Sequence, residues 1–261
     1  MNERIAIVTG AGSGIGEGAA LALAAAGCAV AVLDRHEDAA SAVAQRITIA
    51  GGQAIAIMAD VSQPASVAAA AARVQQAFGA CQVLVNNAAV QPTPGPLMGL
   101  ALQAWNDLLA VNLSGALLCA QAFGAQMIAA GRGGTIINIA SIGGDHAWPG
   151  SGAYCVGKAG LLMLTRQLAL ELAPQRIRCN SIKPGLVRTP ASEPLYADLD
   201  VVRRREQIIP SGRIAQPQQL ANVITFLASD RSDYINGEDI MVDGGVGRIL
   251  MGLIPRSAPR T

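Results

Sequence analysis

Runs of apolar, mostly β-branched residues alternate with longer Ala/Leu-rich stretches of helical period, and this alternation restricts the fold more than any other feature of the sequence. The runs that predict strands are residues 4–8, 29–33, 53–58, 83–85, 135–139, 178–182 and 239–242. Helices are expected near residues 14–26, 38–50, 64–78, 102–130, 152–173 and 216–228. Most strand runs are continuously apolar, as in a parallel sheet with both faces covered. The sequence therefore predicts an α/β fold with one doubly wound parallel sheet of about seven strands and helices on both faces.

No proline- or serine-rich linker and no internal repeat divides the 261 residues, so residues 1–247 are expected to form one domain. Two segments depart from this rhythm. Residues 184–215 are rich in Pro, Arg and Glu, and a loop of this length in a compact domain favours a lid over a cleft. Residues 248–261 are expected to form a tail that is either frayed or docked on a neighbouring subunit, because its apolar side chains would otherwise be exposed.

The charged fraction is low, at 14% of the residues against 51% that are hydrophobic, and the formal net charge is +1. Much of the surface is therefore expected to be apolar or hidden against another subunit. A chain this close to neutral, with 3% aromatic residues, offers neither the positive field nor the stacking platforms that nucleic acids require. Nucleic acid is therefore not expected as a partner.

Five cysteines, an odd number without a CxxC pair, argue against a disulfide framework and a zinc site and indicate reduced thiols. The chain enters an apolar strand by residue 4, without the pattern of a secretory signal. Residues 108–131 carry no charge, but Asn112, Gln121 and several glycines interrupt them, so a buried helix is favoured over a membrane span. A cytoplasmic protein without a membrane segment or a metal site is predicted.

A glycine-rich turn, Thr-Gly-Ala-Gly-Ser-Gly-Ile-Gly at residues 9–16, lies between the first predicted strand and the first predicted helix. Glycine permits unusual dihedral angles, a close approach of the backbone to a ligand, and tight packing of helix on strand. The start of the helix then offers free N–H groups and a positive dipole end to a phosphate. A purely structural tight turn is the alternative, but the position of this turn favours a Rossmann-type dinucleotide site.

Two acidic residues at strand ends extend this interpretation. Asp34 follows Gly16 by 18 residues, where a carboxylate accepts hydrogen bonds from both adenosine ribose hydroxyls and repels a 2′-phosphate. This favours NAD over NADP, although the neighbouring Arg35 could soften the preference. Asp60 and Val61 end the third strand, where they could meet the adenine. For both aspartates a simple turn role is the alternative.

The most specific constellation is Ser141 followed by Tyr154-Cys155-Val156-Gly157-Lys158. Tyr154 and Lys158 are four residues apart, so on a helix they share one face. A phenol titrates near pH 10, too high for a base at neutral pH, but a neighbouring ammonium favours the phenolate and is expected to lower the pKa of Tyr154. Ser141, at the end of the fifth strand, could hold a substrate oxygen beside this phenol.

The sequence resembles the short-chain dehydrogenase/reductase family over residues 4–246. TGAGSGIG matches the cofactor turn of that family, and NNAAV at residues 86–90 matches its NNAG segment. VNLSG at residues 111–115, Ser141, YCVGK at residues 154–158 and PGLVRT at residues 184–189 match its remaining signatures. Ala89 departs from the pattern, because the family usually has glycine there. This departure affects the expected backbone shape rather than the chemistry.

The resemblance implies a site and an assembly. The implied catalytic residues are Asn112, Ser141, Tyr154 and Lys158, with Asn112 helping to hold a water linked to Lys158, and Lys158 also holding the nicotinamide ribose. The expected cofactor contacts are Gly10, Ser13, Gly14, Ile15, Gly16, Asp34, Arg35, Asp60, Val61, Asn87, Tyr154, Lys158, Val187 and Thr189, of which Val187 and Thr189 would meet the carboxamide. The family commonly forms homotetramers through two long helices, which correspond here to residues 102–130 and 152–173.

Substrate specificity is expected from residues 142–153 and 184–215, and the tail is a further candidate. His146 could line the pocket or lie in solvent. Trp148 could form an apolar wall of the pocket or pack under the loop. Three basic residues could attract an anionic substrate or pair with nearby Glu193 and Glu206: Lys183, Arg188 and Arg213.

Three functions are compared on these grounds. The first is an NAD-dependent oxidoreductase, an enzyme that interconverts a secondary alcohol, preferably a sugar or polyol, and its carbonyl, with Tyr154 as acid and base. The second is a 3-oxoacyl thioester reductase. The third, a non-catalytic NAD-binding regulator, is disfavoured because such a protein would not need a phenol beside an ammonium.

Overall fold

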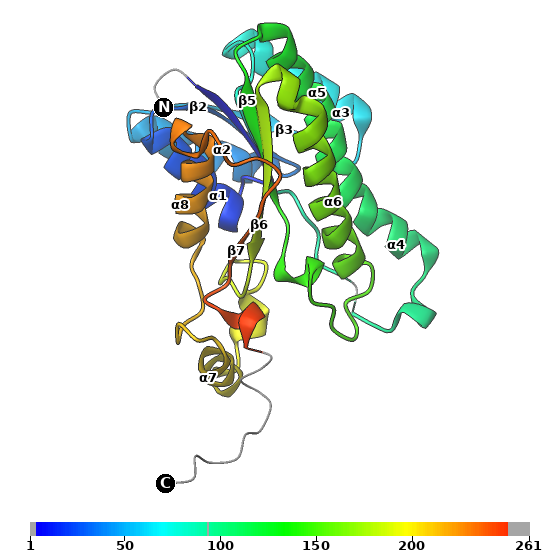
Figure 1. Ribbon diagram of the computed structural model, residues 1–261. Coiled ribbons are helices and arrows are strands. Elements are labelled where there is room, and N and C mark those ends of the chain that lie inside the picture. The colour runs from blue at the N-terminus through cyan, green and yellow to red at the C-terminus, as the bar shows by residue number, and fades with distance from the viewer. Residues whose placement is uncertain (1–3, 93, 250–261) are drawn as a thin grey trace.

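The structure, a computed structural model, describes residues 4–92 and 94–249, and a single parallel sheet organises them (Figure 1). Its strands are β1 (Ile5–Thr9), β2 (Ala29–Asp34), β3 (Gln53–Met58), β4 (Val83–Asn86), β5 (Gly134–Ile139), β6 (Ile177–Pro184) and β7 (Asp239–Val242). They lie in the order β3-β2-β1-β4-β5-β6-β7, and every pair is parallel. The prediction of a seven-stranded, doubly wound sheet is confirmed.

Helices cover both faces of this sheet (Figure 1). One face carries α1 (Gly14–Ala25), α2 (Glu37–Ile49) and α8 (Pro217–Ala228). The other carries α3 (Pro64–Ala77), α5 (Gly115–Ala130) and α6 (Tyr154–Leu172). Within β1, Ala6 and Val8 point into the first core, and Ile5 and Ile7 into the second. Both faces of the strand are therefore buried, which is why the strands read as continuous apolar runs.

The uncharged stretch that was expected as one helix is divided. Helix α4 (Leu102–Leu109) passes through a π-helical turn (Ala110–Ser114) into α5. By length and composition alone residues 102–130 could cross a membrane. In the fold, however, α5 buries Cys119, Phe123 and Met127 against the sheet and α3, as the buried-helix prediction requires.

The predicted lid contains a helix that the sequence reading missed, α7 (Leu199–Ile208). The side chain of Asp198 accepts hydrogen bonds from the N–H groups of Asp200 and Val201, and so caps its first turn. Residues on and around α7 bury a small core of their own around Tyr196, Ile209 and Ile214. Weak periodicity hid this helix, because it packs on that small core and not on the sheet. Of the predicted tail, only residues 248 and 249 are among the described residues, so its docking stays a prediction.

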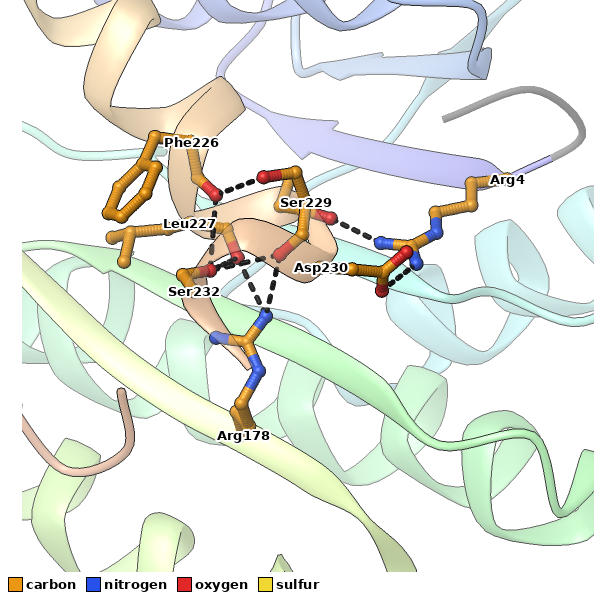
Figure 2. Close-up of polar contacts among 8 residues, drawn as sticks. Arg4, Arg178, Phe226, Leu227, Ser229, Asp230 and Ser232 are labelled. Carbon is orange, nitrogen blue, oxygen red and sulfur yellow. Dashed lines mark hydrogen bonds and ion pairs between the residues drawn. The ribbon is translucent and has the colours of Figure 1, made fainter. Parts of the chain in front are cut away.

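The carboxyl-terminal end of α8 is held by two arginines, Arg4 just before β1 and Arg178 on β6 (Figure 2). Arg178 donates to the carbonyl oxygens of Leu227 and Ser229, at 2.9 and 3.4 Å. Arg4 donates to the carbonyl oxygen of Ala228 at 2.6 Å and pairs with Asp230. A helix leaves its last carbonyl groups without partners inside the helix, and cations at this end also complement the helix dipole.

We predict that Arg178→Met lowers the free energy of unfolding by about 1–3 kcal/mol, because half-buried carbonyl groups lose a charged donor. Urea denaturation measures the change. Arg203→Met is the control: it removes an exposed ion pair with Asp200 and should change stability by less than about 1 kcal/mol. Equal losses in the two variants would contradict the proposed importance of the α8 end.

Candidate active site

A cavity of about 520 Å³ opens at the carboxyl-terminal edge of the sheet, where the strand order reverses between β1 and β4. Open α/β sheets bind their ligands at such a reversal. Most of the sequence-predicted site residues line this cavity: Gly10, Ser13, Gly14, Ile15, Asp34, Arg35, Asp60, Val61, Asn87, Ser141, Tyr154, Lys158, Val187 and Thr189. Gly16 and Asn112 do not line it. The fold thus brings together residues that lie up to 179 positions apart, from Gly10 to Thr189.

The glycine-rich turn is shaped for a close backbone approach. Gly10 and Gly14 both have φ near +60°, where a side chain would be strained. A β-carbon on Gly16 would lie 2.2 Å from the carbonyl oxygen of Gly10, so Gly16 serves the packing of helix on turn. The side-chain amide of Asn87 donates to the carbonyl oxygens of Thr9 and Gly10 and holds the turn against β4.

The amino-terminal end of α1 faces the cavity with its first turn uncapped. Its N-cap residue, Ser13, makes no side-chain hydrogen bond to the first turn. The N–H groups of that turn are thus free of a side-chain cap, and Ser13, Gly14 and Ile15 line the cavity. Free N–H groups and the positive end of the helix dipole suit a pyrophosphate.

The Asp34 carboxylate lies beside this turn at the end of β2. Its two oxygens accept hydrogen bonds from the N–H groups of Gly12, at 2.9 Å, and His36, at 3.0 Å. A carboxylate has about four acceptor sites, so capacity remains for ribose hydroxyls. Arg35 donates through Nε to His36 at 3.0 Å on the exposed rim. Asp34 therefore combines the turn role with a position on the cavity wall.

Asp60 also has a local role. Its side chain accepts from the N–H and hydroxyl groups of Ser62, at 2.9 and 2.7 Å, which forms a tight turn after β3. Asp60 and Val61 nevertheless line the cavity. The turn interpretation is thus correct for Asp60, and contact with an adenine stays a prediction.

Ser141, Tyr154 and Lys158 meet at the inner end of the cavity. Ser141 follows β5, and its oxygen accepts from the N–H of Gly143 at 3.0 Å, which leaves its hydroxyl proton available. Lys158 is 3% exposed and donates through Nζ to the carbonyl oxygen of Ile139 at 2.8 Å. Its Nζ lies 5.8 Å from the centre of the Tyr154 ring. Phenol, hydroxyl and amine thus share one pocket: the helical spacing predicted this for Tyr154 and Lys158, and the strand end predicted it for Ser141.

The pKa of Tyr154 corrects one expectation. The spacing of Tyr154 and Lys158 predicts that the ammonium lowers this pKa, but in the structure the pKa is raised, because burial disfavours the phenolate. A hydrogen bond with the Ser141 side chain partly offsets this effect of burial on the pKa. Burial also lowers the pKa of Lys158, from 10.5 to about 8.

Asn112 lies in the π-helical turn between α4 and α5, and such turns are frequent at functional sites. Its side chain both accepts from the N–H of Val90, at 2.8 Å, and donates to the Val90 carbonyl oxygen, at 3.0 Å. Asn112 thereby holds the segment after β4 in place. A second cavity of about 10 Å³, close to the space one water occupies, touches Asn112 and Ile139. The predicted water there stays a prediction.

The lid supplies the outer wall. Val187 and Thr189 line the cavity together with Ser192, Leu195 and Tyr196. The hydroxyl of Ser192 donates to the Val187 carbonyl oxygen at 2.9 Å and accepts from the N–H of Thr189 at 2.9 Å. The sequence predicted the lid segment but not that Ser192, Leu195 and Tyr196 would line the cavity. The signal available for the last two was an apolar Leu-Tyr pair just before a polar helix.

The remaining sequence candidates take definite positions. Trp148 lies against the Tyr154 ring, with ring centres 5.8 Å apart, and is 44% exposed, whereas His146 is exposed and adjoins Gly247. Lys183 pairs with Asp145, and Arg188 pairs with Glu193 through two hydrogen bonds. Ala89 lines the cavity and has no left-handed backbone conformation, so alanine fits without strain there.

Comparisons with known proteins agree with this geometry. A family model described as enoyl-(acyl carrier protein) reductase matches residues 10–247. The cis-4-hydroxycyclohexanecarboxylate dehydrogenase of Sinomonas cyclohexanicum is 40% identical over 243 residues, which are 93% of this chain and 96% of the relative. The D-threitol dehydrogenase of Mycolicibacterium smegmatis is 38% identical over 245 residues, 94% of this chain and 93% of the relative. A solved gluconate 5-dehydrogenase from Burkholderia cenocepacia, in complex with NADP and tartrate, has a TM-score of 0.89, 36% identity, and coverage of 94% of this chain and 96% of that one.

The chain belongs to the short-chain dehydrogenase/reductase family. It is therefore an oxidoreductase that acts on CH–OH groups with NAD or NADP, and the resemblance seen in its motifs is confirmed. The matched residues of this dehydrogenase begin in the glycine-rich turn and end five residues after the last strand, β7.

The buried Lys158 predicts a pH dependence of stability. Between pH 8 and 10.5 the unfolded dehydrogenase keeps a proton on this amine that the folded one has released, so unfolding becomes less favourable as the pH rises. From pH 7 to pH 10, the free energy of unfolding of wild type should therefore rise by on the order of 2 kcal/mol relative to that of Lys158→Met. Urea denaturation of both proteins at matched concentration measures this. A difference that does not change with pH would show that Lys158 keeps an ordinary pKa.

Proposed function

We propose that this dehydrogenase oxidises a secondary alcohol, preferably a sugar or polyol, with NAD, and that Tyr154 is its acid and base. The observation that carries the proposal is the meeting of Ser141, Tyr154 and Lys158 in one cavity with the glycine-rich turn and Asp34. The named relatives include dehydrogenases of a cyclic hydroxy acid and of a polyol, which supports an alcohol over a 3-oxoacyl thioester.

The residues present fit a dinucleotide. The uncapped first turn of α1 would hold the pyrophosphate, and Asp34 would accept the adenosine ribose hydroxyls. Val187 and Thr189 would meet the nicotinamide carboxamide, and Lys158 the second ribose. NAD, when bound, supplies the acceptor for the hydride that leaves the alcohol carbon.

The chain's own residues handle the proton. Ser141 would donate its hydroxyl hydrogen to the substrate oxygen and hold that oxygen beside the phenol. Tyr154 as phenolate would then accept the alcohol proton at its Oη. Because burial raises the pKa of Tyr154, oxidation should be favoured at alkaline pH and the reverse reaction at lower pH. Asn112 holds the backbone of Val90 and would also help to hold the proposed water that links to Lys158.

Tyr154→Phe tests the acid-base role. We predict a loss of turnover of at least about a hundredfold, since general acid-base catalysis contributes roughly 10²–10⁴. NADH binding, measured by fluorescence titration, should stay within a few-fold of wild type. Turnover of Tyr154→Phe near the wild-type value would contradict the role of Tyr154 as the base. If wild type binds NAD but oxidises no sugar, polyol or hydroxy acid, the alternative of a non-catalytic NAD-binding regulator is favoured.

Asp34→Ala tests the cofactor preference. Wild type should prefer NAD, and the variant should narrow the ratio of kcat/KM for NAD over NADP by roughly tenfold, because the carboxylate that repels a 2′-phosphate is gone. Asp60→Ala is the matched control, because this aspartate ends the neighbouring strand and should leave the ratio nearly unchanged. A wild type that already prefers NADP would contradict the assignment of Asp34.

Two further expectations are carried as proposals. The outer faces of α5 and α6 expose the large apolar side chains Leu117, Ile128, Val156, Met163 and Leu170, which supports assembly of copies through these helices into a tetramer. A monomeric mass in sedimentation would contradict this. All five cysteines are free and buried, which is consistent with the proposed cytoplasmic location.

A further inference from the structure

A buried lysine next to the active site is paired with an acidic residue of the loop that follows Ser141. Lys183 lies near the end of β6, directly before Pro184 and Gly185, which line the cavity. Its side chain is 10% exposed and pairs with the Asp145 carboxylate, which is 30% exposed. The two charges therefore neutralise each other at the edge of the reaction pocket.

This ion pair crosses between two elements, whereas the other hydrogen bonds of the loop start are local. The N–H groups of Gly144 and Asp145 donate to the carbonyl oxygens of Ser141 and Ile142. The Ser141 oxygen likewise accepts from the N–H of Gly143. In the described part of the chain, the hydrogen bond between Asp145 and Lys183 therefore ties residues 142–149 to a strand, β6.

The position of this loop determines how the reacting groups face each other. Ser141 begins the segment and Tyr154 ends it, on the first turn of α6. Gly143 and Gly144 pack so tightly that added β-carbons would lie 2.6 Å from the Trp148 ring and 2.8 Å from Leu162. Trp148 in turn contacts the Tyr154 ring. A shift at Asp145 would therefore move both the serine hydroxyl and the aromatic wall beside the phenol.

We propose that Lys183 is a positioning residue, which holds the loop 142–149 through Asp145 so that Ser141 and Trp148 keep their places beside Tyr154. The proposal rests on the function proposed above. It also means that Lys183 does not act as a binding group for an anionic substrate, because its charge is already paired inside the protein.

The first test is kinetic. Lys183→Met should reduce kcat by about tenfold or more, because small displacements of catalytic groups are costly, while the Kd of NADH stays within about twofold. Asp145→Asn should reproduce this loss, and Lys183→Arg, which keeps the charge, should restore most of kcat. Arg166→Met is the control: it removes an ion pair that also joins two elements, α6 and β7, through Asp239 but lies away from the cavity lining, and should leave kcat unchanged.

The second test does not need turnover. In a Trp105→Phe background the fluorescence of Trp148 reports the loop alone, because the chain has two tryptophans. Lys183→Met should shift the Trp148 emission to longer wavelength, as the half-exposed ring loses its packing on Gly143 and Tyr154. Arg166→Met should not shift it.

The outcomes separate the two proposals. A normal kcat and an unchanged Trp148 emission in Lys183→Met would overturn the positioning role and leave an ion pair that only adds stability. A rise in KM confined to carboxylate-bearing alcohols, with kcat unchanged, would overturn it in favour of substrate binding. If wild type oxidises no alcohol, the proposed function fails, and the Trp148 emission still decides whether Lys183 holds the loop.

Discussion

The burial of both faces of the sheet is the constraint on which the structure depends. With apolar side chains committed to the two cores, β1, β2 and β4 each end on a polar residue, Thr9, Asp34 and Asn86. Parallel strands bring those ends to one edge, and the reversal of strand order between β1 and β4 opens the cavity there. Asp34, Asn87 and Ser141 reach the same cavity for this reason, although they come from three different strand ends.

Burial also sets the chemistry of the site. The same low-polarity surroundings raise the pKa of Tyr154 and lower the pKa of Lys158, so the pKa of the amine falls below that of the phenol. The Lys158 amine keeps a hydrogen bond to the Ile139 carbonyl oxygen. A hydrogen bond with the Ser141 side chain lowers the pKa of the Tyr154 phenol and so partly offsets the effect of burial. In this arrangement, the hydrogen bond with Ser141 is the contact that favours the ionised form of the phenol against the effect of burial.

The sequence predicted each strand of the sheet to within one or two residues at its ends. It could do so because both faces of the sheet are buried, which makes the strands continuous apolar runs. It also placed Tyr154 and Lys158 on one face, since a four-residue spacing on a helix fixes a shared face, and Ser141 joins them from the end of β5. It could not predict features decided by contacts between distant segments. The π-helical turn at Asn112, the pairing of Lys183 with Asp145, and the capped helix α7 all depend on such contacts or on local caps. The direction of the Tyr154 pKa was wrong because spacing reports a neighbour but not the depth of burial.

The lid around α7 buries Tyr196, Ile209 and Ile214 with Leu186, Val202 and Val246, largely apart from the two cores that stabilise the sheet. The Tyr196 ring is flanked by Arg188 and Arg205, with guanidinium carbons 5.8 and 5.3 Å from its centre. Tyr196 belongs both to this small core and to the wall of the cavity. A substitution within the small core can therefore reshape the outer wall of the cavity while the packing of the main helices on the sheet is left intact.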